Sequence, residues 1–219
     1  MKKLLAAALI SLITISGFAL SLQDVCTGLS KNANTRGDFV QTKTINANGR
    51  QLKSSGNFII SKDGIMWKTL KPFPSTMVIT ENTMIQTAAN GKQTVMDGSD
   101  NQIFKNISQT LQSVFAGNSE ELEALFTVKF TDNKDGSWKT LLTPKDSTIA
   151  SVMQSLELAG RDGAGLAGAA GDASAAGGQI VLDSLSLQEA SSNSIRYEFS
   201  NQKYPKELTA DEKAVFVVK

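Results

Sequence analysis

The side chains that most often carry catalysis are scarce in this chain of 219 residues. The sequence contains no histidine and a single cysteine, Cys26. Without histidine the chain cannot build a Ser-His-Asp or Cys-His nucleophile, nor a zinc site based on imidazole ligands. The composition therefore excludes the most familiar hydrolase mechanisms.

Neighbouring carboxylates are the remaining groups that could perform acid–base chemistry. They occur as Asp132 with Asp135 and as Asp211 with Glu212. Each pair stands at a predicted turn or helix start, where carboxylates commonly accept hydrogen bonds from backbone amides. We interpret all four as solvated turn and cap residues. The sequence therefore predicts a protein that is not an enzyme, with no metal site and no cofactor.

Cys26 fits a buried position in a short amphipathic helix. The apolar residues recur at the i, i+3, i+4, i+7 spacing of one helical face, which predicts a helix over residues 22–31: Leu22, Val25, Cys26 and Leu29. Asp24 nearby disfavours a reactive thiolate. A single cysteine also excludes an intramolecular disulfide.

The N-terminus has the three parts of a cleavable secretory signal peptide. Lys2 and Lys3 precede an apolar stretch that runs to Leu20, and Ala19-Leu20-Ser21 offers small residues for cleavage. A retained anchor is the alternative, but polar residues interrupt the stretch, which is short for a span of about 20 apolar residues. We predict that residues 1–21 are removed and that the protein is then soluble in the periplasm. The polar segment before Cys26 argues against lipidation.

Charge and length bound the partners of the mature chain. Loss of Lys2 and Lys3 leaves 20 basic and 21 acidic residues, so the chain lacks the basic surplus that nucleic-acid binding requires. Residues 22–219 are sufficient for one domain with a sizeable core. We expect a monomer that binds no nucleic acid.

From Gly37 to about Met96 the apolar pattern has period two, which is typical of β-strands. Short turns separate the runs and leave no room for crossover helices, so the sheet is predicted to be antiparallel. Several runs are apolar on both faces: Phe58-Ile59-Ile60, Ile65-Met66-Trp67 and Met77-Val78-Ile79. Either protein covers both faces of the sheet, or one face lines a cavity that something apolar occupies.

The second half of the chain mixes helical and strand patterns. Residues 101–116 carry an apolar stripe at helical spacing, and a short helix is predicted after Asn118. Strands are predicted at residues 126–131, around 138–142, at 180–189 and at 194–200, and a helical turn at 210–213. The Gly/Ala-rich segment at residues 159–178 is predicted to be a flexible loop inserted in a hairpin; a mobile flap over a pocket is the alternative.

A series of short motifs occurs in an order that resembles one known family. The motifs are Gly37-Asp38-Phe39-Val40-Gln41-Thr42-Lys43, Ser55-Gly56-Asn57-Phe58, a Trp-centred strand, Pro72, Met77-Val78-Ile79-Thr80, Leu141-Leu142-Thr143-Pro144-Lys145 and Glu198-Phe199-Ser200-Asn201. Together with the signal peptide and the short first helix, this order resembles the periplasmic outer-membrane lipoprotein carrier family, LolA. Lys62-Asp63 and the Gly/Ala-rich insertion depart from the pattern of that family, which suggests a divergent branch.

The resemblance implies a mainly β fold with helices (α+β), in which a curved antiparallel sheet forms an incomplete barrel closed by short helices. It implies a carrier that shields acyl chains between an inner-membrane donor complex and an outer-membrane acceptor. The cargo is an acylated lipoprotein or another lipid, such as a glycolipid. The alternative is a periplasmic regulatory or sensor domain that binds a membrane protein partner.

Periodicity alone favours an ordinary core for the two-faced strands and the helical stripe, and the resemblance favours a cavity with the stripe as its lid. Ten apolar residues are then expected to line the acyl-chain cavity: Phe39, Phe58, Ile60, Ile65, Trp67, Met77, Ile79, Ile107, Leu111 and Phe115. Acyl chains are recognised by apolar area, so such a site needs no polar constellation.

Overall fold

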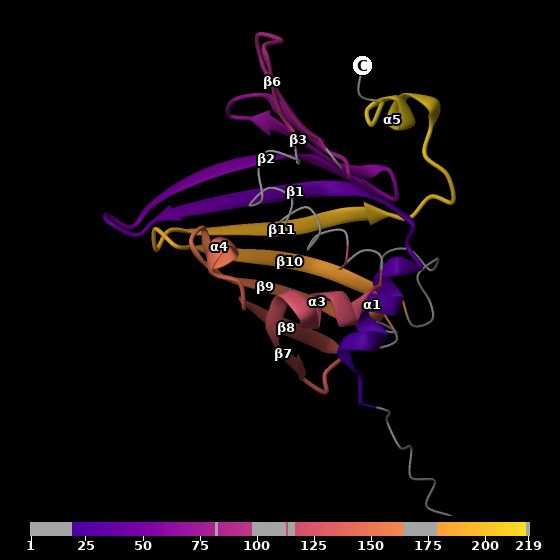
Figure 1. Ribbon diagram of the computed structural model, residues 1–219. Helices are drawn as coiled ribbons and strands as arrows, with labels where there is room; N and C mark the ends of the chain where they lie inside the picture. Colours follow the sequence, from indigo (N-terminus) through magenta and orange to yellow (C-terminus); the bar gives the residue numbers. More distant parts are fainter. Residues whose placement is uncertain (1–18, 82, 98–112, 114–116, 164–178, 218–219) are drawn as a thin grey trace, which may run out of the picture.

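A single curved antiparallel sheet organises the chain in the computed structural model, which describes residues 19–81, 83–97, 113, 117–163 and 179–217 (Figure 1). Its strands are β1 (Asn34–Ile45), β2 (Arg50–Ser61), β3 (Gly64–Lys71), β4 (Ser75–Ile79), β5 (Thr83–Ala88), β6 (Gln93–Asp97), β7 (Phe126–Asp132), β8 (Ser137–Pro144), β9 (Met153–Asp162), β10 (Ile180–Glu189) and β11 (Ser194–Lys203). The described helices are α1 (Leu22–Ser30), α3 (Ser119–Leu125), α4 (Ser147–Ala150) and α5 (Ala210–Ala214).

The first and the last strand of the chain, β1 and β11, lie side by side in the middle of the sheet. The order is β6-β5-β4-β3-β2-β1-β11-β10-β9-β8-β7, so β1 pairs with β11 and each half is a meander that runs away from this seam. The outermost strands, β6 and β7, lie at opposite ends of the order, and the sheet is not closed into a barrel. The predicted incomplete barrel of antiparallel strands is therefore confirmed.

Helix α1 forms where the sequence predicted it and ends at Ser30. Ser21 is its N-cap: the hydroxyl accepts from the backbone of Asp24, whose carboxylate in turn accepts from the backbone of Ser21. The Ser21 hydroxyl also donates to the carboxylate of Asp24, and this hydrogen bond, followed by that from the Ser21 backbone, holds the pKa of Asp24 below its usual value. The apolar side of α1 packs on the sheet, and Cys26 is buried there, as predicted.

We call the face on which α1 and α3 pack the inner face. Two apolar clusters lie on it: one beneath α1 and α3, against the strands from β7 to β10, and one on β1 to β4. Tyr197 and Phe199 of β11 belong to both clusters, so they join the two halves across the seam. The inner face is therefore a continuous apolar surface across most of the sheet.

The outer face of β2, β3 and β4 is covered by the C-terminal segment that contains α5. Ile59, Met66 and Val78 alternate with the inner residues of their strands and pack against Leu208 and Phe216. Figure 1 shows α5 apart from α1 and α3, on the other side of the sheet. On their outer side, the strands with two apolar faces are therefore covered by protein and do not line a cavity.

The strand β9 was missing from the sequence prediction, which instead began the Gly/Ala-rich loop at Ala159. The structure continues β9 to Asp162, so residues 159–162 are strand and the predicted loop starts too early. Gly160 explains the error, because a Cβ built there would lie 2.5 Å from the indole of Trp138 and 2.0 Å from a backbone oxygen. Glycine, which is typical of loops, here allows Trp138 to pack closely against β9 within the sheet.

Other predictions lie outside the described residues. They include most of the predicted signal peptide, the remainder of the Gly/Ala-rich loop from 164 to 178, and all of the helix predicted at 101–116 except Ser113. The one-turn helix α4, capped by Asp146, was not predicted. At the N-terminus the fold includes Leu20 and Ser21, two residues that the sequence prediction assigned to the signal peptide.

Candidate functional site

The predicted lining residues that the structure describes lie together on the inner face. The strand register sets Phe58, Trp67 and Met77 opposite one another, and likewise Ile60, Ile65 and Ile79 in the next row. Phe39 of β1 completes this group, which we call the inner cluster. The seven side chains therefore share one surface. The other three predicted residues, Ile107, Leu111 and Phe115, lie outside the described residues.

Aromatic rings gather around Trp67 at the centre of the inner cluster. Its ring centroid lies 5.6 Å from that of Phe39, 5.8 Å from Phe58, 5.3 Å from Tyr197 and 5.9 Å from Phe199. The last two contacts are edge-on, a favoured geometry for aromatic pairs. The prediction missed Tyr197 and Phe199 as site residues, although period two in β11 and its pairing with β1 would have placed them beside Phe39.

On β3 and β4 the inner face becomes polar beyond the row of Trp67. The next inner position on β3 is Thr69, which pairs with Ser75 of β4 and with Gly56 of β2. On β1 the inner position after Phe39 is Gln41, opposite Ser54. On β3 and β4 Trp67 therefore lies at a boundary between apolar and polar side chains. On β1 and β11 the apolar surface continues, because Phe39 and Phe199 pair in the same row as Thr69.

Three buried polar atoms on the inner face have no hydrogen-bond partner among the described residues: the indole Nε1 of Trp67, the indole Nε1 of Trp138 and the hydroxyl of Thr140. Trp138 and Thr140 are each 1% exposed and lie in the half of the sheet beneath α1 and α3. Trp67, in contrast, is only partly buried as a residue. A buried donor without an acceptor is costly, so each such group calls for an explanation.

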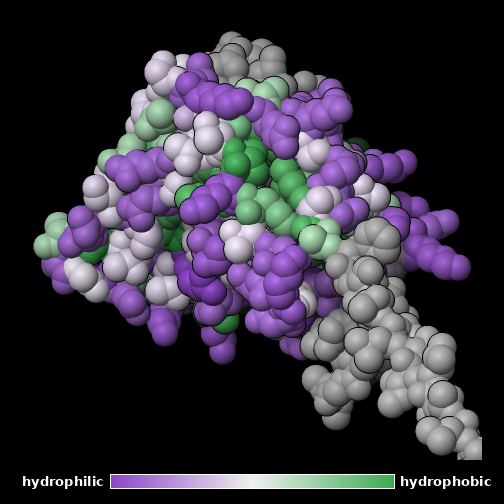
Figure 2. Space-filling model, turned by 90° about the horizontal axis from the view of Figure 1, so that it is seen from below, coloured by the Kyte–Doolittle hydropathy of each residue, from purple (hydrophilic) through white to green (hydrophobic). Residues whose placement is uncertain are grey.

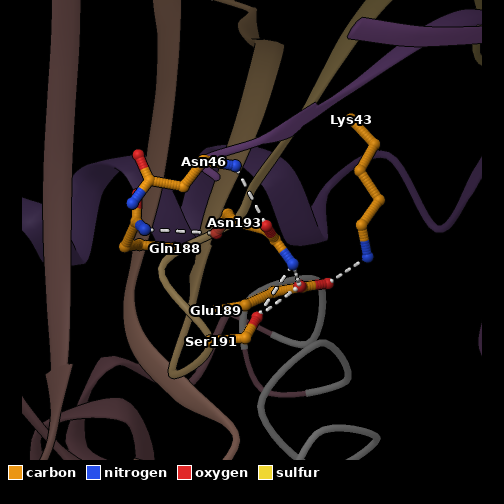
Figure 3. A network of polar contacts seen from close by, with 6 residues as sticks. All are labelled: Lys43, Asn46, Gln188, Glu189, Ser191 and Asn193. Atoms are coloured by element: carbon orange, nitrogen blue, oxygen red, sulfur yellow. Dashed lines mark hydrogen bonds and ion pairs between the residues drawn. The ribbon is translucent and has the colours of Figure 1, made fainter. Parts of the chain in front are cut away.

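A polar network closes the far end of the inner face, where the β1–β2 and β10–β11 hairpins lie (Figure 3). Nζ of Lys43 lies 2.8 Å from Oε1 of Glu189, whose other oxygen accepts from Ser191 and Asn193. Asn193 also accepts from the backbone of Asn46, which joins the two hairpins. These hydrogen bonds, with Lys43 first, hold the pKa of Glu189 below its usual range.

A small cavity borders the inner cluster in the part of the chain that the structure describes. A cavity of about 10 Å³ lies between α1 and the sheet, beside Phe58, Ile60 and Phe199. That is the volume of roughly one water molecule. On the surface, Figure 2 shows apolar residues that gather in the middle of one face, with hydrophilic residues around them. An acyl chain is much larger than the cavity of about 10 Å³ beside Phe58 and Ile60.

A larger opening lies on the outer face and differs in character. This cleft of about 810 Å³ runs between β1, β2, β11 and α5, and its walls carry Arg36, Asp38, Asn57 and Asn201. Nη1 of Arg36 lies 2.6 Å from Oε1 of Glu212, an ion pair that ties α5 to β1. Its polar walls do not suit an acyl chain.

The carboxylates that could have performed acid–base chemistry have structural partners. Asp132 accepts from Lys134 and from the backbone of Leu20, and Asp135 accepts from Ser137. Glu212 completes the capping box of α5. The prediction of turn and cap roles is confirmed for these three. Among the described residues no group of three or more potential ligands could hold a metal ion.

Cys26 and the tyrosines titrate far from neutrality. Burial, with the negative charge of Glu123 as a smaller cause, raises the pKa of the Cys26 thiol to about 11. Burial raises the pKa of Tyr197 to about 12. These groups are therefore neutral at physiological pH.

In the part of the chain that the structure describes, no helix combines the length and hydropathy needed to cross a membrane.

Fold and site together define an open half-barrel of antiparallel strands with an apolar inner face. The sequence matches the family model of the outer membrane lipoprotein carrier protein LolA over residues 30–159, and the chain belongs to this family. A search of curated proteins gave no significant match.

Two solved structures are similar to this chain. A DUF1329 family protein from Desulfovibrio piger has 12% sequence identity and a TM-score of 0.48, with 90% of this chain and 95% of that one covered. A LolA superfamily protein from Nitrosomonas europaea has 9% identity and a TM-score of 0.47, with 91% and 99% covered.

Proposed function

We propose that this protein is a periplasmic carrier that binds the acyl chains of a lipoprotein or another lipid against its inner face and moves them from the inner to the outer membrane. The observation that carries the proposal is the inner cluster, in which aromatic and aliphatic side chains from β1 to β4 and β11 form one surface. Membership of the LolA family supports it.

The physical logic favours binding over catalysis. Each methylene group that leaves water contributes about 0.8 kcal/mol, so a surface of this kind gains affinity from area alone. The inner cluster presents that area, whereas the carboxylates described above serve as caps and turn residues. A carrier must also release its cargo, and a binding surface that gains its affinity mainly from apolar area permits reversible transfer.

The side chains of the inner cluster are packed together, so an acyl chain would have to separate some of them. Phe39, Phe58 and Ile65 are at most 3% exposed and belong to one cluster of packed side chains. Binding would exchange these internal contacts for contacts with acyl chains. In this proposal the donor and the acceptor are membrane complexes, and the cargo passes between them through the periplasm.

A direct test uses a synthetic triacylated cysteine peptide and the protein expressed with its signal sequence and purified without detergent. We expect the peptide to displace a polarity-sensitive apolar dye from the wild-type protein. Met77→Asp places a charge on the partly buried edge of the inner cluster. This change should lower the affinity for the peptide by about ten-fold or more, because the acid would have to be desolvated when an acyl chain covers it.

The matched control is Val95→Asp, at an outer-face position that is 59% exposed. This variant should bind the peptide as the wild type does. Failure of the wild-type protein to bind either dye or peptide would contradict the carrier proposal. Purification of the protein with one membrane protein and no lipid would instead favour the regulatory alternative.

A further inference from the structure

The inner cluster contains one polar atom that its apolar neighbours leave without a partner. The indole nitrogen Nε1 of Trp67 is buried and makes no hydrogen bond in the part of the chain that the structure describes. An indole N–H is a donor only, so just an acceptor can satisfy it. The rings that surround it belong to Phe39, Phe58, Tyr197 and Phe199.

The neighbouring rings compensate this donor only weakly. Tyr197 meets Trp67 at an interplanar angle of 75°, so an N–H can approach an aromatic face. Contacts of that kind are second-order in strength compared with a hydrogen bond to a carbonyl oxygen. The indole N–H of Trp67 is thus a buried donor without an acceptor among the described residues, and a suitable ligand could supply that acceptor.

The place of Trp67 on the inner face narrows the chemistry of that ligand. Along β3 and β4, Ile65 and Ile79 lie on one side of Trp67, and the polar pair Thr69 and Ser75 lies on the other. An acylated molecule has the same division, because a carbonyl group separates its hydrocarbon tail from its polar part. With the tail over the isoleucines, the carbonyl would come level with the indole.

We propose that Trp67 donates a hydrogen bond from Nε1 to the ester or amide carbonyl of a bound acyl chain, so that the carrier selects acylated molecules over ether-linked or purely hydrocarbon ones. This inference rests on the proposed function and adds a ligand class to it. The aromatic rings hold the indole in place, and the apolar row receives the tail.

Two short-chain lipids that differ only in this carbonyl test the idea. The probes are dioctanoyl phosphocholine, which is ester-linked, and the dioctyl ether of the same headgroup, both used below the concentration at which they form micelles. We expect the wild-type protein to bind the ester about two- to twelve-fold more tightly, the equilibrium equivalent of one neutral hydrogen bond. Trp67→Phe retains an aromatic ring but lacks the donor, and should bind both lipids equally.

A second measurement uses the wild-type protein, so it does not depend on whether a variant folds. The chain has two tryptophans, so a proton–nitrogen correlation spectrum contains two indole signals. The Trp67 signal should move downfield with the ester and not with the ether. Trp138, buried beneath α1 and α3, serves as the internal reference.

The outcomes separate this inference from the carrier proposal. Equal binding of ester and ether by the wild-type protein overturns the role of Trp67 and leaves the carrier intact. A preference for the ester that persists in Trp67→Phe also overturns it, because another donor is then responsible. Absence of binding by both lipids and by the triacylated peptide contradicts the carrier proposal itself.

Discussion

The backbone nitrogen of Leu20 donates to Oδ2 of Asp132 across a distance of 3.1 Å. This contact ties the start of the fold to the end of β7, and the side chain of Leu20 packs against the core cluster beneath α1. Ser21, the next residue, is the N-cap of α1. Both residues therefore belong to the folded domain.

This arrangement predicts that the signal peptide is cleaved after Ala19, so that the mature chain begins at Leu20. Gly17 and Ala19 then provide the small residues that cleavage requires. The new ammonium group of Leu20 would face the carboxylate of Asp132, whereas cleavage after Ser21 would remove a cap worth about 1 kcal/mol. Intact-mass measurement of the periplasmic protein decides between the two, and a chain that begins at Leu22 would contradict the prediction.

Gly28 provides a test of how closely α1 docks on the sheet. A Cβ at this position would lie 2.2 Å from Cγ1 and 2.6 Å from Cβ of Ile180 on β10. Alanine favours a helix over glycine by about 1 kcal/mol, but overpacking costs roughly 1–3 kcal/mol. The contact with Ile180 involves its branch point, which cannot rotate away, so the clash should dominate.

We therefore expect Gly28→Ala to lower the free energy of unfolding by about 1–2 kcal/mol in urea denaturation. Thr27→Ala, at the exposed neighbouring position, gains helix propensity without the clash and serves as the control. Equal or greater stability of Gly28→Ala would show that α1 can shift away from β10.

The sequence revealed the strands of the first half because their apolar residues alternate and their turns carry Asn-Gly and Asp-Gly pairs. It identified Phe58, Trp67 and Met77 as members of one surface for the same reason. It could not assign the two faces, since the cover on Ile59 and Met66 comes from Phe216, far away in the sequence. Likewise, β9 was missed because glycine at position 160 is typical of a loop. In the folded sheet Trp138 packs against this position and leaves no room for a Cβ atom.

Phe216 should stabilise the fold without contributing to the proposed binding site. It is 8% exposed and packs on Ile59, Met66 and Val78, on the face opposite the inner cluster. Removal of a buried Phe side chain costs roughly 3–5 kcal/mol, and the terminal segment can relax, so we expect Phe216→Ala to cost about 3 kcal/mol. Denaturant unfolding measures this loss.

Dye binding by the same variant, measured well below its unfolding midpoint, should equal that of the wild type. Met77→Asp should instead bind the dye more weakly than the wild type when it is likewise measured well below its own unfolding midpoint. A large loss of dye affinity in Phe216→Ala would indicate that the outer face, and not the inner cluster, holds the apolar ligand.

The ion pair between Lys43 and Glu189 should make stability depend on pH in an acidic window. The pKa of Glu189 is below its ordinary value of 4.5 in the folded protein, so its contribution is present above about pH 4.5 and is lost as the pH falls through the folded pKa. Both side chains are partly exposed, which limits the effect to roughly 0.5–1 kcal/mol.

Glu189→Gln should therefore lower stability at neutral pH by this amount, and the difference from the wild type should shrink below pH 4.5. Glu207→Gln is the matched control, because Glu207 pairs with Lys213 while its side chain is 82% exposed. Thermal unfolding at a series of pH values checks both variants. A difference that remains constant into the acid range would rule out the ion pair as its source.

The two tyrosines of the chain should stay protonated well above their ordinary pKa of 10. Burial raises the pKa of Tyr197 to about 12, and burial is also the largest cause that raises the pKa of Tyr204 to about 12. Between pH 10 and pH 12 the folded chain consequently holds more protons than the unfolded chain, so stability must fall as the pH rises through this interval. The near-ultraviolet absorbance of tyrosinate should remain absent from the native protein at pH 10 and appear together with unfolding. A native protein that shows about half a tyrosinate at that pH, the amount that one solvent-exposed tyrosine gives, would place Tyr197 or Tyr204 in solvent and contradict the burial of that ring.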